Sequence, residues 1–145
     1  MATTPNLGIA HLEANQSQKE VTANEAFDTL DEAIAGELVH DMASDANYTL
    51  DTSEPEKRQG NLVLRTTDAS VNLGSARDVI RPDKAQMHIA MNETAQTLNC
   101  RTATGSAVVA AVVAGGVAII YTDGTDYYTS KAADDSGAVS TPDFV

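Results

Sequence analysis

The chain has 145 residues and a formal net charge of −12, with no Trp, two Phe and one Cys. This length suits one modest domain with an appendage, and so acidic a chain is not expected to bind nucleic acid, whose phosphates would repel it. A lone Cys excludes an intrachain disulfide and a Cys-based metal site. The charge is concentrated in residues 1–56, which carry a net −11, whereas residues 57–101 carry +3. A basic surface on a protein partner is one explanation, and an acidic surface that only aids solubility is the other.

Residues 1–20 are expected to form an extended arm. They contain few large apolar side chains, and Pro5 and Gly8 argue against a helix at the start. Such a segment gains order by lying on a preformed partner surface, where main-chain hydrogen bonds and a few apolar pockets offset the entropy of ordering. The apolar residues expected to contact that partner are Leu7, Ile9 and Leu12.

A short helix is predicted to follow the arm. Thr22 and Glu25 have the spacing of a capping box, with Thr22 as N-cap, and the helix should end near Gly36. One apolar stripe is expected along it, formed by Ala23, Phe27, Leu30, Ile34 and Leu38. The stripe is close to a heptad seam, so it can pair with copies of itself, and the alternative is that it packs on the chain's own β-domain.

The N-terminal sequence resembles a family. The matching segments are Pro-Asn-Leu-Gly at 5–8, the polar core at 16–26 and the acidic Leu-Asp-x-x-Ile sequence at 30–34. Similar segments begin short proteins and fibres of tailed phages, prophages and gene transfer particles of alphaproteobacteria. The resemblance covers roughly residues 5 to 38, and it implies a segment that docks on a capsid or tail.

From Ala46 onward the hydrophobic period changes to two, which predicts short strands. A polar loop is expected at 51–60, and Asp123 to Asp126 should form a hairpin turn with Gly124 at positive φ. The predicted strands are 46–50, 61–66, 71–73, 78–81, 86–92, 98–102, 107–113, 117–122 and 127–130. This spacing predicts a mainly β protein, with an arm and helix over 1–44, a small β-sandwich or jelly-roll-like domain over 45–130 and a tail over 131–145.

A second resemblance lies between Asn92 and Tyr128. The course Leu-x-Cys-x-Thr, Val-Val, Gly-Gly-Val-Ala-Ile-Ile-Tyr and Asp-Gly-Thr-Asp-Tyr-Tyr is similar to the C-terminal β-segment of short phage fibre and spike domains. Asp126 stands where Asn is common there, and residues 114–116 replace the usual Pro-Gly turn. The two resemblances together cover residues 5–38 and 92–128.

No catalytic, cofactor-binding or metal-binding motif is recognised. The chain has neither a Gly-x-Ser-x-Gly elbow nor a phosphate-binding loop. His11, His40 and His88 lack metal-ligand spacing, and each is expected at a surface or interface, with His40 in the helix exit and His88 on the polar face of a strand. Cys100 is expected to be a buried structural thiol. We expect no enzyme, no membrane span and no signal peptide.

The residues and the two resemblances favour a phage virion structural protein. The expected role is a capsid decoration (cement) protein or a short head fibre, held on a major capsid or other virion protein through its arm and helix. The predicted partner-binding residues are Leu7, Ile9, Leu12, Phe27, Leu30 and Ile34. The apolar stripe and the modest core favour a homotrimer. The alternative is a tail or spike module that binds a receptor or glycan through Tyr127 and Tyr128.

Overall fold

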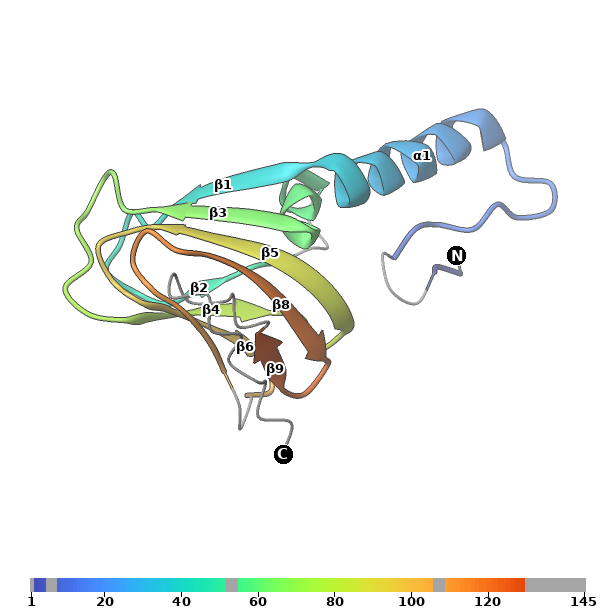
Figure 1. Cartoon of the computed structure of the whole chain (residues 1–145). Coiled ribbons are helices and arrows are strands. Elements are labelled where there is room, and N and C mark those ends of the chain that lie inside the picture. Colours follow the sequence, from blue (N-terminus) through green and yellow to red (C-terminus); the bar gives the residue numbers. More distant parts are fainter. Residues whose placement is uncertain (1, 5–7, 52–54, 106–108, 130–145) are drawn as a thin grey trace.

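The computed structural model of the chain describes residues 2–4, 8–51, 55–105 and 109–129. Two facing β-sheets form a small sandwich-like domain, and one long helix extends from it beside the N-terminal arm (Figure 1). The helices are α1 (Lys19–Ala35) and the 3-10 helix η1 (Pro55–Asn61). The strands are β1 (Glu37–Asp41), β2 (Tyr48–Thr49), β3 (Val63–Thr67), β4 (Arg77–Arg81), β5 (Ala85–Glu93), β6 (Leu98–Thr102), β7 (Ala110–Val112), β8 (Val117–Asp123) and β9 (Tyr127–Thr129). The prediction of a mainly β chain with a sandwich-like domain is confirmed.

The strand pairing is parallel over the first half of the sandwich. One sheet has the order β1-β3-β5-β8-β9 and the other β2-β4-β6-β7, so the chain passes from sheet to sheet at each of the first five connections. Strands β1, β3 and β5 pair in parallel, and their partners are 26 residues apart in both pairs, from 37 to 63 and from 63 to 89. The described chain therefore coils like a short β-solenoid before β7, β8 and β9 close it with antiparallel pairs. A jelly roll, in contrast, is antiparallel throughout.

Side-chain hydrogen bonds tie each coil to the next. The Asp41 carboxylate accepts hydrogen bonds from the hydroxyl and amide of Ser70, and Asp45 pairs with Arg77 at 2.7 Å. One coil later, Asp68 accepts from the amide of Ala95 at 3.1 Å. Several acidic residues are thus structural rather than simple surface charge, because they satisfy backbone groups in the connections.

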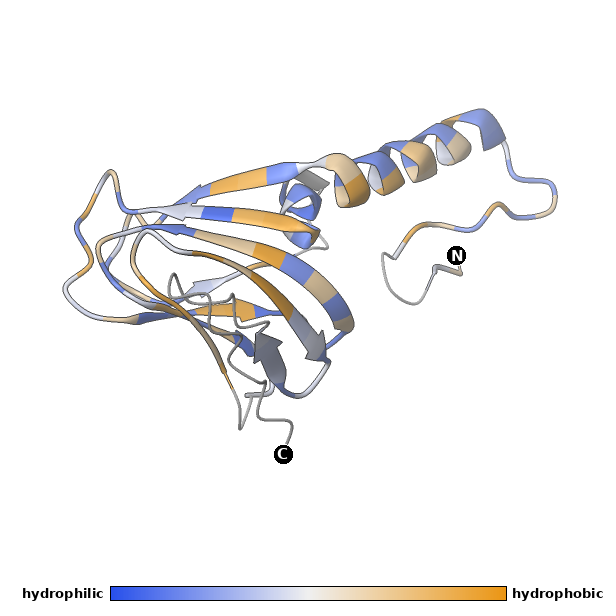
Figure 2. Ribbon diagram, in the orientation of Figure 1, coloured by the Kyte–Doolittle hydropathy of each residue, from blue (hydrophilic) through white to orange (hydrophobic). Residues whose placement is uncertain are grey.

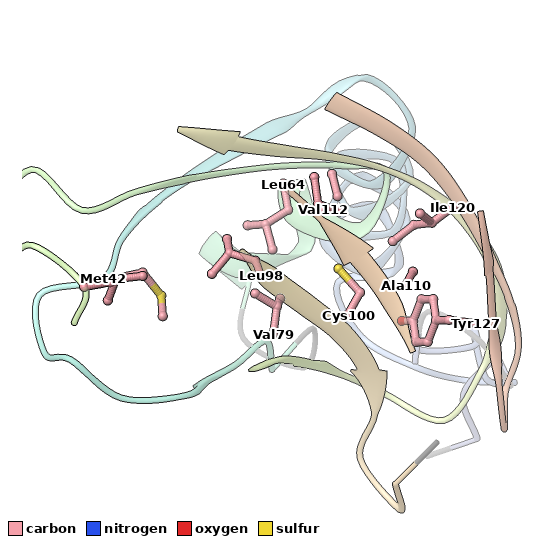
Figure 3. Close-up of a cluster of buried hydrophobic side chains, with 11 residues drawn as sticks. Met42, Leu64, Val79, Leu98, Cys100, Ala110, Val112, Ile120 and Tyr127 are labelled. Atoms are coloured by element: carbon pink, nitrogen blue, oxygen red, sulfur yellow. The ribbon is translucent and has the colours of Figure 1, made fainter. Parts of the chain in front are cut away.

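The core between the sheets contains mostly small and medium side chains. Figure 3 shows Cys100 among Val79, Ala110 and Tyr127, and Cys100 is only 2 % exposed. This confirms the prediction of a buried thiol, whose pKa is raised by burial. Buried threonines share this interior, so its apolar content is limited.

Helix α1 begins earlier than predicted. It starts at Lys19, and its N-cap is Gln18, whose φ of 58° is left-handed, so Thr22 as N-cap is wrong. The Thr22 hydroxyl instead accepts a hydrogen bond from the Gln16 side chain at 2.6 Å. Lys and Glu are good helix formers, and they extend the helix by a turn. The predicted end is confirmed, because Gly36 is the C-cap.

Close backbone approach explains the glycine at the end of α1. A Cβ on Gly36 would lie 2.5 Å from the carbonyl oxygen of Glu32 and 2.8 Å from Gln59 of η1. Gly60 is similarly constrained, because a Cβ there would lie 2.9 Å from the Leu38 side chain. Thus η1 fits tightly beneath the junction of α1 and β1, on the inner side of the sheet.

The secondary structure corrects several sequence expectations. Residues 37–41 form β1, so His40 lies in a strand rather than in a helix exit, and the sheet begins at Glu37 rather than at residue 45. Residues 71–73 form no strand, because the amide of Leu73 is bonded to the Asp68 side chain instead of to a sheet. Part of the predicted polar loop is η1. The predicted tail over 131–145 lies outside the described residues.

Candidate functional site

The outer face of the five-stranded sheet is apolar and exposed. Strand β8 places three large side chains on it, and β5 places Met87, Ile89 and Met91 opposite them in register. Tyr128 of β9 continues this row, with its ring centroid 6.3 Å from that of Tyr121. The exposed large side chains on this outer sheet face are Val39, Met87, Val117, Ile119, Tyr121 and Tyr128, each between 48 % and 63 % exposed. Alternating apolar and polar bands are visible along β5 in Figure 2, whereas β8 is mostly apolar.

Charged side chains on the outer sheet face lie mostly at strand ends. Glu37 begins β1, and Glu93 and Asp123 end β5 and β8. Arg65, in the middle of β3, pairs with Glu93 at 2.8 Å and with Glu37 at 3.7 Å. An apolar centre with a charged rim is the usual anatomy of a protein–protein interface, in which Tyr and Met are enriched.

The apolar stripe of α1 lies on the same side as the outer sheet face. The helix turns Thr29 and Ala33 toward η1, and Arg58 of η1 donates to the Thr29 hydroxyl at 2.9 Å. Since η1 is on the inner side of the sheet, the opposite side of α1 faces outward, where Phe27 and Ile34 are 67 % and 66 % exposed. Only Gly36 separates α1 from β1, so the helix continues directly from an edge strand of the sheet (Figure 1).

The N-terminal arm lies against a different side of α1. Residues 8–10 and the Glu25/Thr29/Glu32 side of the helix line an open groove of about 490 Å³, which Arg58 also borders. The arm folds back on itself within the described residues through an antiparallel bridge between Thr3 and Ala10. It is therefore a loop beside the helix rather than a fully extended arm.

The predicted partner-binding residues fall into two groups. Ile9 is half-buried at the groove, and Leu12 is 54 % exposed on the arm. Leu30 is 38 % exposed, and it belongs with Phe27 and Ile34 to the stripe, which faces away from the groove. The structure does not bring the two groups together, and Leu7 lies outside the described residues.

Sequence reasoning missed the outer sheet face. The alternation of Met87, Ile89 and Met91 with polar residues is recognisable, but it predicts an exposed side for His88. The structure buries His88 to 1 % exposure and turns Met87 outward, so that prediction is wrong. The sequence of β8 could have indicated an apolar outer face, because apolar residues of this strand point to both sides of the sheet.

A polar cluster occupies one end of the interior. Arg81 is 1 % exposed, and its Nη1 donates to the carbonyl oxygen of Gly60 at 2.9 Å. The Nδ1 of His88 lies 2.9 Å from the carbonyl oxygen of Asn61 and 3.1 Å from Arg81 Nη1. The shorter carbonyl contact favours a proton on Nδ1, leaving Nε2 to accept from the Tyr127 hydroxyl at 3.4 Å. Nε and Nη2 of Arg81 have no hydrogen-bond partner among the described residues.

The cluster is arranged for structure rather than for proton transfer. Burial, followed by the charge of Arg81, lowers the pKa of His88 to about 3. Burial also raises the pKa of the Tyr127 phenol. Neither group is poised to exchange a proton near neutral pH, which general acid–base catalysis requires. Tyr127 is also only 1 % exposed, so its predicted exposure to a ligand is wrong.

The described part of the chain, residues 2–4, 8–51, 55–105 and 109–129, offers neither a metal site nor a membrane-spanning helix. Those residues contain no group of three or more His, Cys, Asp or Glu side chains that could hold a metal ion. In the same ranges, neither helix combines the length and the apolar character needed to cross a membrane. His40 stacks on Tyr48 with ring centroids 3.4 Å apart.

Comparisons of the chain with protein-family models, with curated proteins and with solved structures found no match.

Proposed function

We propose that this chain is a structural component of a phage virion, either a capsid decoration protein or a short head fibre. In this proposal the arm and α1 attach to the major capsid protein or to another virion protein, and the β-sandwich projects from it. The N-terminal resemblance and the fibre-like segment from Asn92 to Tyr128 support this assignment.

The observation that carries the proposal is the exposed N-terminal region. Helix α1 contacts the rest of the fold chiefly through η1, and it leaves Phe27 and Ile34 about two-thirds exposed. Leu12 of the arm is 54 % exposed as well. Apolar side chains on a projecting helix and arm are costly in water, and burial against a partner offsets that cost. An anchoring role gives these residues a reason to be apolar.

The acidic N-terminal half suits a basic partner surface. Residues 1–56 carry a net −11, and α1 itself contains Glu20, Glu25, Asp28, Asp31 and Glu32. A complementary patch would steer docking and fix its orientation. Attachment should therefore weaken as salt is raised, because exposed charges are screened.

The test is co-sedimentation with particles that lack the protein. Virions from a strain deleted for this gene should bind the full chain and should not bind a chain lacking residues 2–20. The truncated chain must retain the circular dichroism and melting temperature of the β-domain. A truncated chain that binds at full occupancy would show that the arm is not the anchor, and a full chain that never binds would reject a virion role.

One observation favours the alternative of a receptor- or glycan-binding tip. Tyr121 and Tyr128 form an exposed aromatic pair, and the Tyr128 hydroxyl donates to Asp123 at 3.3 Å. Aromatic faces next to a carboxylate can stack on a sugar ring and bind its hydroxyls. Glycan-array binding that is lost in Tyr128→Ala would support the tip, and an array without signal would reject it.

A further inference from the structure

We propose that the outer sheet face binds the same surface of a second copy of this chain. The proposal concerns self-association and does not depend on attachment to a virion. It places the contact mainly on the sheet, whereas the sequence indicated only the helix. The stripe of α1, with Phe27 and Ile34, is left to the virion partner of the proposed function.

The exposed apolar area matches what a stable interface needs. Six large side chains of the outer sheet face are between 48 % and 63 % exposed, and Ile89 and Met91 beside them are partly exposed. Half-exposed side chains of this size present on the order of 100 Å² each, so the surface approaches the roughly 800 Å² per partner of a standard interface. The largest apolar patch of an ordinary monomer is about 300–600 Å². A surface of this extent is unusual unless it is covered.

The charge pattern favours an identical copy as the occupant. The chain carries −12 overall, so two copies repel unless they meet through a surface with few carboxylates. The centre of the outer sheet face is such a surface, because Glu37, Glu93 and Asp123 lie at strand ends. Arg65 of β3 lies between Glu37 of β1 and Glu93 of β5. This row of side chains therefore carries both positive and negative charge, so it is complementary to the same row of a second copy.

The interior supports the same conclusion. The fold buries several polar or charged residues besides its apolar core, among them Arg81, His88 and Asn92. A sheet that turns His88 inward and Met87 outward places much of its apolar area on the outside. Association of copies would bury that area and give this small fold a second apolar layer.

Sedimentation equilibrium of the full chain tests the proposal. The wild type should have a mass of two or more times 15.2 kDa. Ile119→Asp, at the centre of the sheet face, should sediment as a folded monomer. Val71→Asp is the matched control, because Val71 is exposed but lies in the β3–β4 connection, and it should assemble as the wild type does. A monomeric wild type, or an Ile119→Asp variant that assembles normally, overturns the proposal.

Methionine oxidation in the unmodified protein provides a second test that needs no variant. Peroxide should oxidise Met87 severalfold more slowly at concentrations where the chain is assembled than where it is dissociated. Met42, which is 2 % exposed, should be slow at both concentrations. Protection of Met87 in a monomer would show that another segment, such as residues 130–145, covers the face, and it would overturn a second copy as the occupant. A chain ending at residue 129 that loses this protection would identify that segment.

Discussion

Both faces of the five-stranded sheet are rich in apolar side chains, whereas the outer face of a sandwich sheet is usually polar. The inner face buries Thr66, His88, Asn92 and Thr122, each at 2 % exposure or less. The outer face leaves Met87, Ile119 and other large apolar side chains about half exposed. The difference supports a division in which the inner face stabilises the fold and the outer face serves the proposed self-association. The interior is held by hydrogen bonds and modest packing, whereas the outer face holds apolar surface that the folded monomer does not use.

Neighbouring isoleucines on β8 give the sharpest test of this separation. Ile120 is 1 % exposed and Ile119 is 52 % exposed. Ile120→Asp buries an unpaired carboxylate in the core, and it should lower the free energy of unfolding by more than about 4 kcal/mol or prevent folding. Ile119→Asp should lower the free energy of unfolding by less than about 1 kcal/mol when the wild type and the variant are compared as monomers.

Urea unfolding followed by circular dichroism measures both variants. The comparison must be made at several protein concentrations, because assembly adds a concentration-dependent stabilisation to the wild type. Equal losses in the two variants at high dilution would contradict the division between the faces. The Ile120 variant should bind a dye for exposed apolar surface, and the Ile119 variant should bind less dye than the dissociated wild type.

Arg81 tests whether charge or volume matters inside the sandwich. Arg81→Ala removes the donor to the Gly60 carbonyl oxygen and leaves a cavity, so it should cost about 3–5 kcal/mol of unfolding free energy. Arg81→Met keeps the length without the charge, and it should cost less than about 1.5 kcal/mol. A loss with Met as large as that with Ala would indicate that the polar guanidinium, through its charge and its hydrogen bond to Gly60, stabilises the fold more than its volume does.

His88 should make the fold sensitive to acid. Its folded pKa is about 3, below the ordinary value of 6.5, so the unfolded chain binds the extra proton between these values. The contribution of the neutral, buried His88 to the free energy of unfolding is complete above pH 6.5 and is lost as pH falls. Between pH 6.5 and about 4.5 the loss should be about 2–3 kcal/mol.

His88→Gln provides the control for this pH dependence. Glutamine cannot titrate, so the variant should lose most of the slope of unfolding free energy between pH 6.5 and about 4.5. His40, whose pKa is also lowered by burial, contributes equally to both chains and cancels in the difference. Asp41 and Asp123 have lowered pKa values and act at more acidic pH. Identical slopes in the wild type and the variant would contradict a neutral buried imidazole.

Local signals predicted the later strands well. The predicted strand 98–102 is β6 itself, because Leu98 and Cys100 alternate with polar residues and short turns flank the run. Strand β1 was missed because Leu38 also fits the helical spacing of the α1 stripe. The capping box at Thr22 was misplaced because a side-chain contact from Gln16 competes for the same hydroxyl.

The parallel pairing was not predictable from alternation alone. A period of two is the same for parallel and antiparallel partners, so only the distance between paired segments distinguishes them. A faint repeat was present: Ala43, Ala69 and Ala95 follow β1, β3 and β5 at the 26-residue offset of the paired strands. The outer sheet face was missed because the alternation rule assumes that apolar side chains point into the same fold.

A further expected effect concerns the hairpin that joins β8 to β9 on the outer sheet face. Gly124 has a φ of 99°, as predicted, and its amide donates to the Thr122 hydroxyl at 3.0 Å. Gly124→Val forces a β-branched residue into that conformation, and it should cost about 1–3 kcal/mol of unfolding free energy. Gly116→Val is no suitable control, because a Cβ at that position would lie 2.9 Å from the Val113 carbonyl oxygen. Gly124→Ala is the better control: alanine is not β-branched, so the free energy of unfolding of this variant should lie between those of the wild type and of Gly124→Val. The hairpin positions Tyr128 beside Tyr121, so Gly124→Val should also weaken self-association in sedimentation. An unchanged melting temperature would argue against a tight turn, and lost stability with full assembly would show that the Tyr128 end of the sheet lies outside the contact.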